Sequence, residues 1–64
     1  MQEGTAFEHS LCDAAEAVWR SASRQARVVR FTYRGRKYRS TLTLLAVLVE
    51  DAATGKHICG RYTA

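Results

Sequence analysis

Two short patterns in this chain pair a histidine with a cysteine, residue types that ligate zinc or form a nucleophile with its base. His9 precedes Cys12 by three positions, and His57 precedes Cys59 by two. A two-histidine, two-cysteine set could hold zinc, but neither spacing is that of a common zinc module. Either pair could also act as nucleophile and base, yet nothing recognisable supplies an orienting third group or an oxyanion hole. We therefore predict no metal, no other cofactor and no enzymatic activity.

The two cysteines also raise the question of a disulfide. A cross-link between Cys12 and Cys59 would close a long loop and could stabilise a domain of only 64 residues. Residues 1–4, however, show neither the basic start nor the apolar run of a secretory signal. We therefore expect a cytoplasmic protein whose cysteines are reduced thiols.

Positive charge is concentrated in the middle of the chain. The sequence has ten Lys and Arg against six Asp and Glu, a formal net charge of +4 at pH 7. No acidic residue falls between Ala17 and Val49, whereas the same interval holds seven arginines and one lysine. Such asymmetry indicates an anionic partner. The predicted basic binding face consists of Arg30, Arg34, Arg36, Lys37 and Arg39.

The leading prediction is a small non-catalytic binding module that uses this basic hairpin against nucleic acid or an acidic protein surface. Phe31, Tyr33 and Tyr38 are interleaved with the cations and could stack on bases, although the expected register turns them towards the core. No RNP-type or helix-turn-helix pattern accompanies the charge. The plainer interpretation is a solvated outer face whose cations keep a sheet edge from pairing with other chains.

An amphipathic helix is expected at about residues 6–26. Thr5 and Glu8 have the spacing of a capping box, and a helical periodicity of apolar residues follows them. Acidic residues occupy the first half of this segment and arginines the second half, which complements the helix dipole. Residues 1–4 precede the pattern, and we expect them to be disordered. The apolar face is made of Phe7, Leu11, Ala14, Ala15, Val18, Ala22 and Ala26, with Cys12 and Trp19 at its edge.

Three strands are expected after the helix, at about residues 28–34, 37–50 and 56–62. Gly35 and Arg36 suit a two-residue type II′ turn, which would pair Tyr33 with Tyr38. The most apolar run, residues 41–49, would be the central strand, and it is far shorter than the roughly 20 residues of a membrane helix. We predict an α+β fold in a single domain of residues 1–64. One helix packs on a three-stranded antiparallel meander in the order 1-2-3, with no association with membranes.

Adjacent leucines at positions 44 and 45 conflict with a simple alternating strand. Either a β-bulge within residues 44–46 shifts the phase, or both faces of the sheet are apolar at this end. In the second case a surface containing Leu45, Val47 and Val49 would need a second copy to cover it. The alternative function is therefore a homo-oligomeric interaction or structural protein, and the chain is either a monomer or a homodimer.

Overall fold

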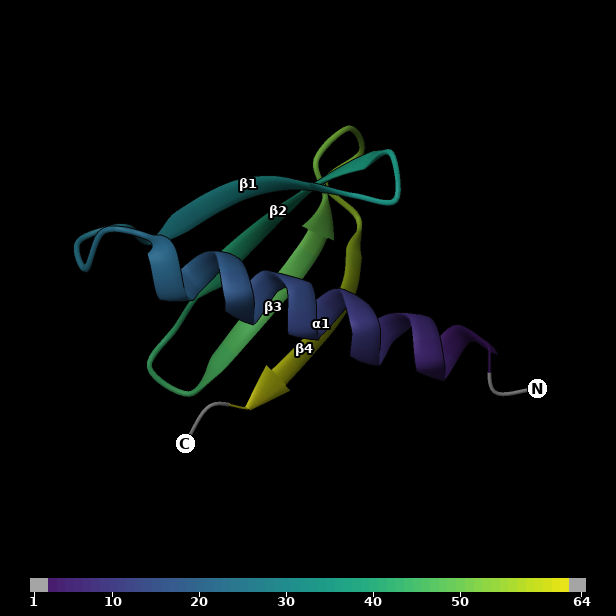
Figure 1. The fold of residues 1–64 in the computed structure, drawn as a ribbon, viewed down its shortest axis with the longest axis horizontal. Coiled ribbons are helices and arrows are strands. Elements are labelled where there is room, and N and C mark those ends of the chain that lie inside the picture. Colours follow the sequence, from purple (N-terminus) through teal and green to yellow (C-terminus); the bar gives the residue numbers. More distant parts are fainter. Residues whose placement is uncertain (1–2, 63–64) are drawn as a thin grey trace.

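The computed structural model describes residues 3–62, with side chains from residue 6 onward, and has an α+β fold. Its four strands form one antiparallel sheet in the order β1-β2-β3-β4, and α1 lies across one face of that sheet (Figure 1). The predicted class, one helix on an antiparallel sheet, is confirmed. The elements are α1 Glu3–Ser21, β1 Val28–Tyr33, β2 Arg36–Leu42, β3 Ala46–Asp51 and β4 His57–Tyr62.

The stretch expected to be one central strand is two strands joined by a tight turn, so the prediction of three strands is wrong. β2 ends at Leu42 and β3 begins at Ala46. The Thr43 hydroxyl forms the turn by accepting the N–H groups of Leu45 and Ala46, at 3.2 and 3.0 Å. It also donates to the Ala46 carbonyl at 3.1 Å. Leu44 and Leu45 lie in this turn with 97% and 60% of their surface exposed, which removes the conflict without a bulge at that point.

The first hairpin is closed by Arg34 and Gly35 rather than by Gly35 and Arg36. Both residues have positive φ, 53° and 80°, as a type I′ turn requires. As a result Tyr38 pairs with Phe31 instead of the predicted Tyr33. This register differs from the predicted one by two residues, and an even shift leaves the side chains of residues 28–33 and 37–42 on their expected faces.

The turn between β3 and β4 follows the expected turn chemistry. Asp51 is buried, and its carboxylate accepts the N–H groups of Ala53 and Thr54 at 2.8 and 3.1 Å. Gly55 takes the left-handed conformation, with φ of 75°. Between β3 and β4 the register shifts after Val49, which leaves Ile58 as the extra residue of a bulge.

The helix begins and ends earlier than the sequence pattern predicts. It starts at Glu3, ahead of the proposed cap at Thr5, so residues 3–4 are helical and residues 1–2 lie outside the described range. It ends at Ser21, and the Ser23 hydroxyl then accepts the N–H of Gln25 in a following turn. Serine side chains compete with helical backbone bonds in this way, which explains the early end. Within the described chain, α1 lacks an apolar stretch long enough to cross a membrane.

The core lies between α1 and the sheet. α1 packs mainly against β1, β3 and β4. Its buried residues, Leu11, Cys12 and Ala15, share one side of the helix. Side chains alternate between the two faces of a sheet, so each strand has one set of side chains on the face towards α1. The buried apolar cluster consists of Leu11, Cys12, Ala15, Tyr38, Val47, Val49 and Cys59. Partly buried side chains around it are Phe7, Trp19, Phe31, Tyr33, Leu42 and Ile58.

Candidate functional site

The face of the sheet turned away from α1, here called the outer face, has no helix over it within residues 3–62 (Figure 1). Its composition changes along the strands. The end near the β1–β2 turn is charged, and the end near the β2–β3 turn is apolar. The strand residues of the outer face are Val28, Arg30, Thr32, Lys37, Arg39, Thr41, Ala46, Leu48, Glu50, His57, Gly60 and Tyr62.

A row of charged residues crosses the basic end of the outer face. Arg30 on β1 lies directly opposite Arg39 on β2, and Arg39 lies opposite Glu50 on β3. The Arg39 guanidinium donates a hydrogen bond to the Glu50 carboxylate. Lys37 occupies the next outer-facing position along β2, opposite Thr32. Like charges directly opposite one another destabilise a sheet, and Glu50 neutralises only one of the two arginines.

The other two residues of the predicted basic face lie elsewhere. Arg34 is in the hairpin turn, with its guanidinium carbon 5.3 Å from the centre of the Tyr33 ring. Arg36 alternates with Lys37 and points to the side of α1, where its Nη1 lies 3.7 Å from the Asp51 carboxylate. The five predicted residues therefore do not share one surface. Three lie on the outer face, one at its tip and one on the opposite side.

The apolar end of the outer face is formed by residues that sequence reasoning did not group together. Val28 and Tyr62 are 47% and 83% exposed, at opposite edges of the sheet. Between them Leu48 lies over Gly60, where an added Cβ would come within 2.9 Å of the Leu48 Cδ2 atom. Leu44 and Leu45 are also exposed, in the β2–β3 turn at the same end of the sheet.

The predicted subunit interface is only partly at the surface. Leu45 is exposed in the turn, but Val47 and Val49 are 3% and 0% exposed. They face α1 because Leu42 pairs with Val47 across the turn, which keeps them on the inner side of the sheet. Neither valine is accessible to a second copy while α1 is in place.

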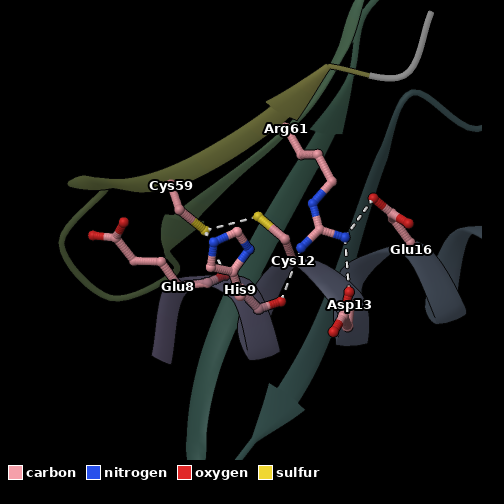
Figure 2. A network of polar contacts seen from close by, with 7 residues as sticks. All are labelled: Glu8, His9, Cys12, Asp13, Glu16, Cys59 and Arg61. Atoms are coloured by element: carbon pink, nitrogen blue, oxygen red, sulfur yellow. Dashed lines mark hydrogen bonds and ion pairs between the residues drawn. The ribbon is translucent and has the colours of Figure 1, made fainter. Parts of the chain in front are cut away.

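A thiol pair lies between α1 and β4 (Figure 2). The sulfur atoms of Cys12 and Cys59 are 3.2 Å apart, and either thiol can be the donor. The Cys59 thiol also lies 3.8 Å from the Glu8 carbonyl oxygen. Burial raises the pKa of Cys59 to about 12, and the hydrogen bond with Cys12 adds to the shift. Both cysteines are free thiols in this structure.

The two histidine–cysteine patterns meet at the groove beside these thiols. The groove has a volume of about 390 Å³, and His9, Cys12, His57 and Cys59 all contribute to its lining. In the part of the chain that the structure describes, no three His, Cys, Asp or Glu side chains come close enough to hold a metal ion. These four residues therefore share only the lining of an open groove.

Arg61 is a contact residue that the sequence analysis missed. Its Nη1 donates to Asp13 at 2.7 Å and to Glu16 at 3.1 Å, and its Nη2 donates to the His9 carbonyl at 3.1 Å (Figure 2). These bonds join β4 to one side of α1. The carboxylates raise the pKa of Arg61 above its ordinary value, chiefly through the bond to Asp13. No local pattern identifies such a contact, because its partners lie more than 40 positions away along the chain.

The chain was compared with models of known protein families, with curated proteins and with solved structures, and none of the three comparisons found a match. Its function is therefore inferred from the placement of its own charges, thiols and apolar side chains. Two regions stand out in that placement: the basic end of the outer face, and the thiol pair beneath the groove.

Proposed function

We propose that this chain is a non-catalytic binding module that uses the basic end of its outer face against an anionic partner. The observation that carries the proposal is the placement of Arg30 directly opposite Arg39 on a face that α1 leaves uncovered. Two cations held side by side repel each other, and an anion bound between them would relieve that repulsion.

The internal ion pairs support an external partner for this face. Asp13 and Glu16 bind Arg61, while Glu50 and Asp51 contact Arg39 and Arg36. Among the residues with described side chains, no carboxylate forms an ion pair with Arg30 or with Lys37. Both cations are exposed, so an anionic polymer can approach them without disturbing the fold.

The position of the aromatic residues narrows the mode of binding. The Phe31 and Tyr38 rings pack against each other on the helix side of the sheet, with centroids 5.9 Å apart, and Phe7 and Tyr33 do so at 6.0 Å. These rings cannot also stack on bases. Tyr62 is exposed on the outer face but lies at its apolar end, so binding at the basic end is electrostatic. Nucleic acid is the favoured partner because its phosphates present closely spaced negative charges that release counterions when cations replace them. An acidic protein surface is the other possible partner.

A titration with labelled DNA and RNA of mixed sequence, at low salt and followed by fluorescence anisotropy, tests the proposal. The variant Arg30→Glu/Lys37→Glu should lose binding. The matched control Arg20→Glu/Arg24→Glu changes the net charge equally, in the last turn of α1 and in the loop that follows it, and should retain most of the binding. Thermal melts establish that both variants are folded. An equal loss of affinity for nucleic acid in the two variants would contradict a binding site on the outer face. Absence of binding to either nucleic acid by the unaltered chain would restrict the partner to an acidic protein surface.

The apolar end of the outer face supports a second candidate function, self-association. Val28, Leu44, Leu45 and Tyr62 are large apolar residues exposed at this end of the molecule. Clustered exposed apolar side chains commonly mark protein interfaces. A second copy packed there would leave the basic ends of both sheets accessible, so the two functions are compatible.

A further inference from the structure

We propose that Cys12 and Cys59 form a reversible disulfide that cross-links α1 to β4. This cross-link would make the attachment of α1 to the sheet depend on redox conditions. The proposal does not rest on the proposed binding function. The two residues are the only cysteines in the sequence, so neither has a competing partner within the chain. The structure brings them together although 47 positions separate them.

The distance between the sulfur atoms favours this bond. They are 3.2 Å apart, and a disulfide bond is about 2.0 Å long, so an approach of about 1.2 Å completes the bond. Each cysteine is on a regular element: Cys12 is in α1 and Cys59 is in β4. Arg61 already ties these two elements together through Asp13 and Glu16, so the cross-link joins parts of the fold that are held in place (Figure 2).

The groove beside the thiols gives a small oxidant access to them. The two cysteines are only 3% and 6% exposed, but both line the groove of about 390 Å³ described above. The charged and titratable groups that line the groove together with the pair are Glu8 and His9 from α1, and His57 and Arg61 from β4. The groove is open to solvent between those two elements, and we assign it as the route of a small disulfide reagent to the thiols.

The oxidant belongs to the class of low-molecular-weight disulfides. One cysteine, as its thiolate, attacks a sulfur of the reagent, forming a mixed disulfide and releasing the first small thiol. The second cysteine then attacks the protein sulfur of that mixed disulfide, loses its proton to solvent and releases the second small thiol. The protein gives up two hydrogens, as two electrons and two protons, and the reagent gains them as two thiols. The raised pKa of Cys59 makes its thiolate scarce at neutral pH, so exchange through this sulfur should accelerate as the pH rises.

The effect of the bond on folding follows from thermodynamic linkage. A cross-link across 47 positions lowers the entropy of the unfolded chain far more than that of the folded one. The equilibrium constant for forming the disulfide must then be larger in the folded chain than in the unfolded chain. The ratio of the two constants equals the factor by which the cross-link shifts the folding equilibrium towards the native state. For a loop of this length that factor is about a hundredfold or more.

Equilibration of the whole reduced chain with mixtures of reduced and oxidised glutathione tests the proposal. Native and guanidinium-denatured samples are quenched with an alkylating reagent, and their masses are measured. We expect an intramolecular product that has lost two hydrogens and takes up no alkylating group. Its equilibrium constant should be about a hundredfold or more larger in the native sample. Equal constants in the two samples, or disulfide-linked dimers as the main product, would overturn the proposal.

Single variants provide the matched controls. Cys12→Ala and Cys59→Ala should each stop at the mixed disulfide with one glutathione, and their melting temperatures should not rise in the oxidising buffer. The unaltered chain should melt at a higher temperature once oxidised. An unchanged melting temperature after complete oxidation would also overturn the proposal. These measurements use no nucleic acid, so they stand or fall separately from the binding proposal.

Discussion

Trp19 on α1 donates its indole N–H to the hydroxyl oxygen of Ser40 on β2, at 2.9 Å. Ser40 is completely buried, and its hydroxyl donates in turn to the Leu48 carbonyl on β3, also at 2.9 Å. The helix is thereby tied to the two middle strands by a polar chain inside the core. Among the described residues no buried side-chain nitrogen or oxygen lacks a partner. Arg61 holds the preceding turns of the helix to β4, so α1 is fixed at two points along its length.

Ser40→Ala should destabilise the protein by about 1–3 kcal/mol, because it leaves the Trp19 N–H and the Leu48 carbonyl without this partner in a mostly apolar setting. Urea denaturation measures the free energy of unfolding. Trp19→Phe removes the donor and keeps an aromatic ring, so it tests the same bond from the other side. The double variant should lose less than the sum of the two single losses. Strictly additive losses would show that the two groups do not interact.

The faces of the sheet could be predicted from the sequence, and its strand count could not. Alternation of apolar and polar residues assigned the side chains of residues 28–33 and 37–42 to their faces, and an even shift in register left that assignment intact. The turn at Thr43 carries no Gly or Pro, the usual signals of a turn. It depends on hydrogen bonds of one threonine hydroxyl, which no periodicity reveals.

That one missed turn also explains the misplaced interface. Reading residues 37–50 as one strand placed Val47 on an exposed surface that a second copy would cover, and a lysine on such a surface leaves a subunit folded. Because Val47 is buried against α1, Val47→Lys should instead unfold the chain. The thiol pair and the Arg61 contacts were beyond prediction for a different reason. Both depend on where the helix crosses the sheet, which is set by packing between distant residues.

Arg34→Asn should stabilise the first hairpin by about 0.5–1 kcal/mol. Arg34 has φ of 53°, a left-handed conformation that asparagine tolerates better than arginine. The control is Gly35→Ala, which at φ of 80° should destabilise the protein by about 1 kcal/mol. Thermal and urea unfolding measure both changes. A loss of stability in Arg34→Asn would mean that the contact of the guanidinium with the Tyr33 ring outweighs the backbone strain.

Binding to nucleic acid should weaken as salt is added, with little dependence on sequence. The logarithm of the association constant should fall linearly with the logarithm of salt concentration, because each phosphate contact releases about one counterion. Arg30→Ala/Lys37→Ala should reduce the magnitude of that slope by about one for each residue removed. Titrations of DNA at several salt concentrations measure the slope. An unchanged slope would place the phosphate contacts on other cations.

Leu44→Lys should leave the stability of the subunit unchanged within about 0.5 kcal/mol, since the leucine is 97% exposed in the β2–β3 turn. If the apolar end of the outer face joins two copies, the same change should weaken that association. Sedimentation at micromolar and near-millimolar concentrations measures the mass of the unaltered chain and of the variant. If the unaltered chain stays monomeric at all of these concentrations, self-association is not a function of the protein.

The stability of the reduced protein should fall as the pH rises from about 9 towards 12. Burial, together with the hydrogen bond and charge of Cys12, raises the pKa of Cys59 from 9.0 to about 12 in the folded state. Between these values the unfolded chain has lost the thiol proton and the folded chain still holds it. Unfolding therefore releases a proton, and alkali favours the unfolded state. Below the pKa that Cys59 has in the unfolded chain, both states hold the proton, and the thiol contributes fully to the free energy of unfolding.

Urea denaturation at a series of alkaline pH values, with reductant present, measures this dependence. The decisive comparison is with Cys59→Ala, which lacks the thiol and keeps every other titratable group. The variant should start from a lower stability because a buried side chain has been shortened. Its stability should also decline less steeply above pH 9, because the proton released by Cys59 on unfolding is missing. Parallel declines in the two proteins would mean that Cys59 ionises alike in the folded and unfolded states.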